Sequence, residues 1–424
     1  MLAALLISFF GAMFFSVPIA LSISFSSILT LELFSSITPQ FVGNSIFSAS
    51  NNFSLIALPF FMIAGALMQH GGVSKRLIGF CKMLVGGIHG SLGMVSVLAC
   101  MLFAAISGSG PATVASIGCI TLPMMIHDEN YDGGYAGALV ATAGGLGVVI
   151  PPSIPMISYA VLAEENIGNL FIAGIIPGIL IGVILMIVNY VVCRGKKMGI
   201  VVKRRLTFKI FWDTLKDSIL ALLMPVIILG GIYGGLFTPT EASCVAVVYG
   251  LVVGVFVYKE IKWSTYKKIV LDAAVMSGTA LIIMSMCDMF TWVLTVNRIP
   301  TMLADFITTT FTTPFFFVVA LSVILLILGC FMSVNAAIVV LTPILVPIIR
   351  LRGYSPIQLG IVMIICLSIG MVTPPFGVNM FISANITKVA VDKQFKWIFL
   401  LVGACLLGLL AVIAFPWLTL GLLK

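Results

Sequence analysis

Hydrophobic positions along the chain form long runs, and polar positions gather into short stretches between them. Met1–Leu31 contains no charged residue, and neither does Leu33–Gly72. Because about 20 consecutive apolar residues can cross the hydrocarbon core of a bilayer, each run is long enough for a membrane helix. No basic residues precede the first run, which is untypical of a cleaved signal peptide. The pattern predicts an all-α polytopic membrane protein whose first run is a membrane helix.

Composition strengthens this prediction. Of the 424 residues, 61% are hydrophobic and 8% are charged, and the mean hydropathy is +1.23. A soluble domain of this size could not keep so large an apolar share from water. The nine cysteines form no CxxC pair and the three histidines are far apart. We therefore expect buried thiols, with no disulfide, no transition-metal site and no prosthetic cofactor.

The net charge of +8 comes from basic residues in the predicted loops. The most basic loop, Arg194–Lys209, is predicted to be cytoplasmic, because Lys and Arg collect on that side of a membrane. Threading the chain outward from this loop places 18 of the 22 Lys and Arg residues on the cytoplasmic side. The threading requires Ser91–Ile126 and Pro314–Ile349 to be re-entrant hairpins, which enter and leave on one side. The charge thus indicates orientation in a lipid bilayer and no nucleic-acid partner.

The second half of the chain repeats the polar interruptions of the first half. Tyr131 precedes a Pro-Pro pair at Pro151 by 20 residues, and Tyr354 precedes another at Pro374 by 20 residues. Upstream of each pair, a polar tip interrupts an apolar segment, with the sequence SGSGP in the first half. In the threading the two hairpins enter from opposite sides, which predicts inverted repeats. Matched interruptions in two halves of this kind are a pointer to a transporter's binding site.

The interruptions suit the binding of a hard cation. An unpaired backbone group in hydrocarbon costs several kcal/mol, so a broken helix needs another partner for its carbonyls. Glycines permit unwinding and prolines remove amide donors, which leaves carbonyl oxygens free. We predict that these oxygens and nearby hydroxyls bind sodium. The predicted sodium-binding residues are Ser107, Gly108, Ser109, Gly144, Val148, Pro151, Ser333, Asn335, Gly370, Val372 and Thr373.

A substrate is predicted beside these cations, where the ends of half-helices carry partial positive charge that attracts anions. The segments 91–126, 133–163, 306–349 and 353–387 contain no Asp, Glu, Lys or Arg. Proton-coupled carriers usually need a titratable relay in the membrane, so sodium coupling fits better. The predicted substrate-binding residues are Gly110, Thr113, Ser153, Asn335, Pro375 and Asn379.

Two polar features lie outside this pattern. Thr238 and Glu241 have the spacing of a helix capping box, with Pro239 at the first helical position. We favour that structural role over the docking of a partner by Glu241. Asp288 is a carboxylate within an apolar segment, and its role stays open between coupling or subunit contact and a local pairing near the outer boundary.

Five motifs spread over the chain resemble a known family. They are LPFFMIAGALM (Leu58–Met68), SGSGPATVASIG (Ser107–Gly118), GGLGVVIPPSIPMISYA (Gly144–Ala160), GLFTPTEAS (Gly235–Ser243) and VTPPFGVNMF (Val372–Phe381). They are similar to the large membrane subunit, DctM, of tripartite ATP-independent periplasmic (TRAP) transporters.

The resemblance implies sodium-driven import of a small organic acid, of the C4-dicarboxylate or sialic acid class, across the bacterial inner membrane. It also implies two partners: a periplasmic substrate-binding protein and a small four-helix membrane subunit, here expected as a separate chain. The mechanism would be of the elevator type, in which a hairpin-bearing domain slides against a scaffold. The implied parts are scaffold helices at 1–90, a first transport repeat at 91–163, scaffold and connecting helices at 164–313 with a cytoplasmic loop at 194–217, a second transport repeat at 314–387 and a C-terminal helix at 388–424.

Two other classes of protein compete with this interpretation. An intramembrane serine hydrolase would need a basic partner for a serine such as Ser109, and the three histidines are predicted near cytoplasmic edges. No GxxxxGK[ST] phosphate-binding motif is present either, so we expect no enzyme. The other alternative is a channel or a sodium-dependent dicarboxylate carrier that acts alone. Dependence of uptake on a binding protein separates that alternative from a TRAP transporter.

Overall fold

The computed structural model describes residues 2–15, 17–34, 43–44, 46–48, 51, 53–85, 88–196, 198–199, 208–296, 298, 302, 314–374 and 377–423. Within these ranges the regular elements are all helices. Eight helices are long and apolar enough to cross a membrane, or up to nine if a bent pair counts as one span. The predicted all-helical, multi-pass class is confirmed.

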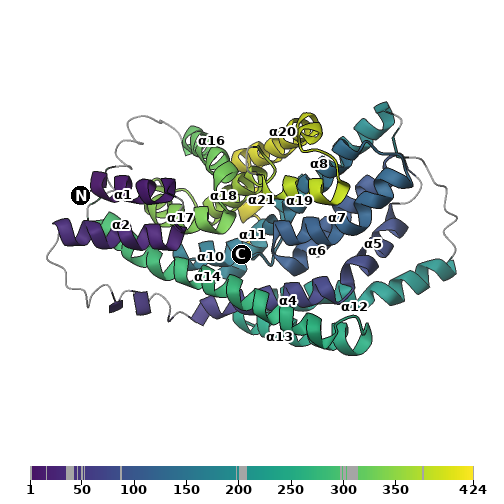
Figure 1. The fold of residues 1–424 in the computed structure, drawn as a ribbon, viewed down its shortest axis with the longest axis horizontal. Coiled ribbons are helices and arrows are strands. Elements are labelled where there is room, and N and C mark those ends of the chain that lie inside the picture. Colours follow the sequence, from purple (N-terminus) through teal and green to yellow (C-terminus); the bar gives the residue numbers. More distant parts are fainter. Residues whose placement is uncertain are drawn as a thin grey trace.

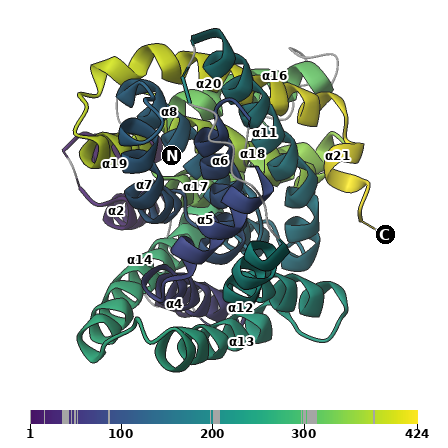
Figure 2. The same cartoon turned by 90° about the vertical axis from the view of Figure 1, so that its right-hand side faces the viewer.

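One group of helices forms a layer along the lower side of Figures 1 and 2. In this layer α4 packs against both α13 and α14, and α12 packs against α13. Several apolar side chains on it, such as Val248, Leu271 and Val275, are more than half exposed, as suits a surface that lipid covers. Its members are η1 (Phe53–Ile56), α4 (Ala57–His70), α12 (Phe208–Tyr233), α13 (Pro239–Leu251), the π-helical turn η2 (Val252–Val257) and α14 (Trp263–Val296). The N-terminal pair α1 (Leu2–Phe14) and α2 (Ile19–Phe34) packs on α14 through α2.

The predicted capping box at the start of α13 is present. The Thr238 amide donates to Glu241 Oε2 at 2.8 Å, and the Glu241 amide donates to Thr238 Oγ1 at 3.3 Å. Pro239 follows directly, at the first helical position. Because an amide at that position has no acceptor within the helix, the missing amide hydrogen of proline costs no hydrogen bond. The structural role predicted for Glu241 is confirmed.

The first hairpin segment, 91–196, begins with two helices that double back on each other. Its helices are α6 (Ser91–Ser107), α7 (Gly110–His127), α8 (Gly133–Gly144), α9 (Leu146–Val149), α10 (Ile154–Leu162) and α11 (Ile167–Lys196). Ser91 Oγ at the start of α6 donates to Glu129 Oε1 at 3.1 Å, just beyond the end of α7. The amide of Gly93 donates to Tyr131 Oη at 3.0 Å. These bonds close the base of the hairpin, and burial there raises the pKa of the Glu129 carboxyl.

The second hairpin segment, 314–420, follows the same order of helices with a looser hairpin. Its helices are α16 (Pro314–Phe331), α17 (Val334–Leu351), α18 (Pro356–Gly370), α19 (Val378–Thr387), α20 (Asp392–Ala414) and α21 (Trp417–Leu420). Here α16 packs chiefly against α18, and α17 packs against α10, α14 and α18. The two segments form the upper body of Figures 1 and 2.

The two segments pack on each other in a reciprocal way. The half-helix after the first break, α10, packs on the second arm of the other hairpin, α17. The half-helix after the second break, α19, packs in turn on α7, the second arm of the first hairpin. The helices that close the segments, α11 and α20, pack against each other. Tyr159 of α10 also donates its hydroxyl to the Pro356 carbonyl at 2.6 Å.

A single helix, α5 (Val73–Leu84), joins α4 of the lower layer to α6 of the first hairpin. Its buried residues include Ser74, Leu77, Ile78 and Cys81, at the spacing of one helical face. That face packs against α12 on one side and α6 on the other. The helix is therefore one covalent connection between the two bodies, and the chain also passes between them from α11 to α12 and from α14 to α16.

The capping box generates a first prediction. Thr238→Ala removes the side-chain acceptor for the Glu241 amide and is expected to cost about 1 kcal/mol of stability. Thermal unfolding in detergent measures the effect as a lower midpoint. Thr238→Ser keeps the acceptor and serves as the control, with a midpoint close to that of the wild type. Equal midpoints for both variants would contradict the capping role.

Candidate ion and substrate site

The first hairpin tip is a two-residue turn between helices. Gly108 has φ +59°, a left-handed conformation that glycine adopts without a steric penalty. Ser109 is extended at the N-cap position of α7, where its side chain makes no capping bond, and its carbonyl accepts from Thr113 Oγ1 at 2.8 Å. Ser107 Oγ lies 3.0 Å from Thr113 Oγ1. Two predicted sodium ligands, Ser107 and Ser109, therefore bring their oxygens together with that of Thr113 at this turn.

The tip lies directly against the first helix break. A methyl group added to Gly147 would lie 2.6 Å from both the Ser109 carbonyl oxygen and Thr113 Oγ1. On the other side, a methyl group on Gly110 would lie 3.3 Å from the Gly144 carbonyl oxygen. Such close approach of two backbones is possible only where a side chain is absent. The structure thus places the SGSG tip beside the segment Gly144–Pro151, where the sequence predicted it.

The first break separates α8 and α9 from α10, with a bend of 40° between the two parts. Ser153 caps α10 and donates its hydroxyl to the Val148 carbonyl at 2.6 Å. Val148 was predicted to bind sodium and Ser153 to bind substrate. The structure joins them in one hydrogen bond, although a carbonyl oxygen keeps a second lone pair for another partner.

The second tip and break show the same chemistry with fewer direct contacts. Ser333 caps α17, and the Asn335 Oδ1 atom is buried with no hydrogen-bond partner among the described residues. Thr373 Oγ1 donates to the Ile369 carbonyl at 2.8 Å. The backbone of Gly370 is pressed against Gly329, near the end of α16. Gly329 is a contact of the break that the sequence prediction missed.

Two hydrogen bonds join the two halves at the breaks. Ser368 Oγ donates to the Gly145 carbonyl at 2.8 Å across 223 positions of sequence. That separation equals the offset between Tyr131 and Tyr354, so the two bonded residues are equivalent positions of the predicted repeat. Asn379 Nδ2 donates to the Ala141 carbonyl at 3.2 Å. Ser368 was missed by the sequence prediction, and the repeat offset was the signal that could have found it.

The space between the two breaks is small. A cavity of ≈ 10 Å³ lies there, about the space of one water molecule. Its polar side chains are Thr142 and Ser368, both buried. Its lining residues are Thr142, Leu146, Val149, Ile181, Ile365, Ser368, Ile369, Val372 and Cys405. The lining is uncharged and mostly apolar, and Val372 is the one predicted sodium-binding residue among the described residues that line it.

Two helix N-termini converge next to this centre. A methyl group on Gly110, the first residue of α7, would lie 3.3 Å from Asn379 Nδ2, near the start of α19. The Asn379 side chain is fully buried, and its Oδ1 atom has no partner within the described ranges. The first amides of both helices thus face a region that favours negative charge. The predicted substrate residue Pro375 lies outside the described residues, and so does the side chain of Asp288, whose role the sequence left open.

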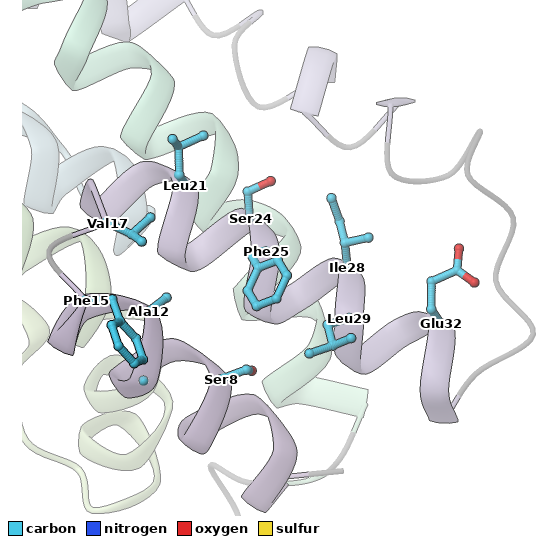
Figure 3. A pocket seen from close by; sticks show the side chains of 11 residues that line it. Ser8, Ala12, Phe15, Val17, Leu21, Ser24, Phe25, Ile28, Leu29 and Glu32 are labelled. Atoms are coloured by element: carbon cyan, nitrogen blue, oxygen red, sulfur yellow. The ribbon is translucent and has the colours of Figure 1, made fainter.

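A second cavity lies away from this centre. A groove of ≈ 790 Å³ opens between α1 and α2 (Figure 3). The polar side chains in its lining are those of Ser8, Ser24 and Glu32. The Ser8 hydroxyl already donates to the Ala4 carbonyl at 2.6 Å. The remaining lining is apolar and resembles lipid-facing helix surface. Because no polar groups converge there, we do not assign the substrate to this groove.

These features define the class of the protein. It is a multi-pass membrane protein in which two hairpin-and-break segments meet at an uncharged centre, as in a secondary transporter. The family follows from comparison with known sequences. The chain belongs to the DctM component of the tripartite ATP-independent periplasmic transporters, whose sequence profile matches residues 6–418. The resemblance inferred from the five motifs is confirmed.

Individual relatives support the same family. The chain is 42% identical over 366 residues to the C4-dicarboxylate TRAP transporter large permease protein DctM of Pseudomonas aeruginosa, covering 86% of this chain and 85% of the relative. It is 33% identical over 410 residues to the sialic acid TRAP transporter large permease protein SiaM of Vibrio cholerae, covering 97% and 95%. It is 38% identical over 400 residues to the isethionate TRAP transporter permease protein DctMQ of Oleidesulfovibrio alaskensis, covering 94% of this chain and 63% of that longer protein.

A solved structure shows the same fold. The YdaH transporter of Alcanivorax borkumensis superposes with a TM-score of 0.69 and covers 95% of this chain and 97% of its own. The sequence identity is 13%, so this likeness shows the fold alone.

The contact between tip and break generates a second prediction. Gly147→Ala places a methyl group against the Ser109 carbonyl and Thr113. The variant is expected to insert into the membrane normally, but its rate of substrate uptake is expected to fall about tenfold or more. Gly403→Ala is the matched control, because a methyl group there has no neighbour within 4 Å. Uptake into proteoliposomes at equal protein content compares the two. Equal uptake by both variants would show that the close contact is not needed.

Proposed function

We propose that the protein carries out sodium-coupled secondary active uptake of a small organic acid across the bacterial inner membrane. The observation that carries the proposal is the pair of helix breaks, each facing its own hairpin, in segments that hold no charged side chain. Sodium is the fitting cation because the available ligands are neutral oxygens. Hydrogen bonds among them, such as Thr113 to Ser109, would orient these oxygens before the ion binds.

The substrate is proposed to bind where the starts of α7 and α19 converge. Amides and helix dipoles favour an anion there, and bound sodium would balance the remaining charge without an arginine. The relatives are named for C4-dicarboxylate, sialic acid, isethionate and 2,3-diketo-L-gulonate. All four names denote organic acids or their anions. We favour a C4-dicarboxylate, with sialic acid as the second class.

Transport is proposed to follow an elevator mechanism built on inverted repeats. The reciprocal packing of α10 on α17 and of α19 on α7 supports an inverted relation between the two segments. The helices α11 and α20 pack within the same upper body. The sequence placed α11 with the scaffold, and we propose instead that α11 and α20 move with the two hairpins.

We further propose that the chain acts with a separate small membrane subunit and a periplasmic substrate-binding protein. Membership of the TRAP family supports both partners. An enzymatic role has no support in the site, because 91–126, 133–163 and 314–349 also lack His, Lys and Arg that could activate a serine such as Ser109.

Sodium coupling is tested by uptake into proteoliposomes that contain the complete complex. Succinate uptake in the presence of the binding protein is expected to follow an imposed sodium gradient. An imposed proton gradient without sodium is expected to have no effect, because the core has no titratable relay. Uptake that follows the proton gradient and ignores sodium would falsify the proposal.

The sequence assigned Thr113 to the substrate, and we propose instead that its hydroxyl acts at the sodium site, because it contacts Ser107 and Ser109. Thr113→Val keeps the shape of the side chain and removes an oxygen beside the Ser109 carbonyl. The sodium concentration for half-maximal uptake is expected to rise about tenfold, which corresponds to about 1.4 kcal/mol of lost binding. Thr279→Val, in the exposed part of α14, is the control and should leave that concentration unchanged. A parallel shift in both variants would assign the effect to general destabilisation.

Partner dependence separates the proposal from a carrier that acts alone. Omitting either the binding protein or the small subunit is expected to abolish uptake of free substrate. Undiminished uptake by the purified chain by itself would favour the stand-alone carrier.

A further inference from the structure

Arg76 is the centre of a polar junction near the start of α5. Its Nε lies 3.3 Å from Asp217 Oδ1 on α12, and its Nη1 lies 3.0 Å from Glu260 Oε1 in the turn before α14. Nη1 also donates to the Gly72 carbonyl at 2.9 Å. The guanidinium carbon is 3.5 Å from the centre of the Tyr258 ring. One side chain therefore joins three separate parts of the lower layer.

Further contacts tie the same turn of α5 to α12. Ser218 Oγ donates to the Arg76 carbonyl at 2.9 Å, and Tyr258 Oη donates to the Asp217 carbonyl at 3.1 Å. The Arg76 side chain is only 16% exposed, whereas the carboxylates of Asp217 and Glu260 are 63% and 42% exposed. A single exposed ion pair contributes little to stability. The planar Arg76 guanidinium, however, contacts two carboxylates, a carbonyl and an aromatic ring, and together these contacts fix its orientation.

The other end of α5 leads to the first hairpin segment. Beyond it, the Gly90 carbonyl accepts from Asn189 Nδ2 of α11 at 2.9 Å. Gly90 has φ +75°, which lets the chain turn sharply into α6. Arg76 thus lies in the first turn of α5, beside the lower layer. Gly90 lies after α5, directly before α6 of the upper body.

We infer that the Arg76 junction is the fixed end of α5 during transport, so that Arg76 is a positioning residue for the movement of the first hairpin. This inference rests on the proposed elevator mechanism. Movement of the upper body would then be taken up at Gly90, where φ is +75°. The junction between α5, α12 and the 258–260 turn would stay closed in both the inward-facing and outward-facing states.

A pair of cross-links tests the inference in the complete complex. The background is a transport-active variant in which the nine native cysteines are replaced. Arg76→Cys with Asp217→Cys removes the ionic junction and is expected to lower the maximal uptake rate about fivefold, a factor typical of one lost kcal/mol. Cross-linking this pair with a short bismaleimide replaces the junction covalently and should restore the rate. A cross-link that leaves the protein inactive would overturn the inference.

A second cross-link joins the upper body to the lower layer. Phe61 on α4 and Phe171 on α11 stack edge to face with ring centres 6.4 Å apart. Phe61→Cys with Phe171→Cys, once cross-linked, should stop uptake if the upper body slides past α4. Continued uptake with this lock would overturn the elevator proposal, whereas the Arg76 pair tests only the anchor. The two failures are therefore distinguishable.

Kinetic constants separate positioning from a loss of folding. Arg76→Lys keeps one charge but loses the planar fork and its stacking on Tyr258, so its maximal rate is expected to fall while the sodium and substrate concentrations for half-maximal uptake stay unchanged. Because both acidic partners are well exposed, the substitution leaves no buried charge without a partner. A rise in either half-maximal concentration with an unchanged maximal rate would contradict the positioning role.

Discussion

The structure depends on one constraint: the backbone carbonyls that lose their helical hydrogen bonds at the two breaks need other partners inside the membrane. In hydrocarbon each such group costs several kcal/mol, so helices that cross a membrane are expected to run unbroken. This chain interrupts two of them and arranges glycines so that hairpin backbones can approach the interruptions closely. Gly147 faces Ser109 and Thr113, and Gly370 faces Gly329. The rest of the upper body holds these two approaches in place.

The two approaches are linked by hydrogen bonds between the segments. Ser368 and Gly145, which are equivalent positions of the predicted repeat, are joined where the segments meet. Asn379 reaches from the second segment to Ala141 of the first. A displacement at one break would act on the other through these bonds, which is the kind of link that the proposed coupling of ion and substrate binding requires.

The lower layer has a different character from the upper body. Its helices expose many apolar side chains and meet the upper body along α4, α12 and α14. Its polar contacts lie at its edge, where Arg76 gathers Asp217 and Glu260 beside α5. The proposed elevator mechanism would need two such bodies, with α5 as one of the connections between them. The YdaH transporter shares this fold at low sequence identity.

The sequence alone determined the membrane class, the places where helices break and the family, because these follow from local composition and from motifs read along the chain. Long apolar runs, Pro-Pro pairs and the capping box at Thr238 each act over a few residues. Only the tertiary structure decided which surfaces meet. The bond between Ser368 and Gly145, the contact of Gly329 with Gly370 and the packing of α11 beside α20 join residues far apart in sequence. Such contacts depend on how twisted helices pack around each other, and no local pattern specifies that packing.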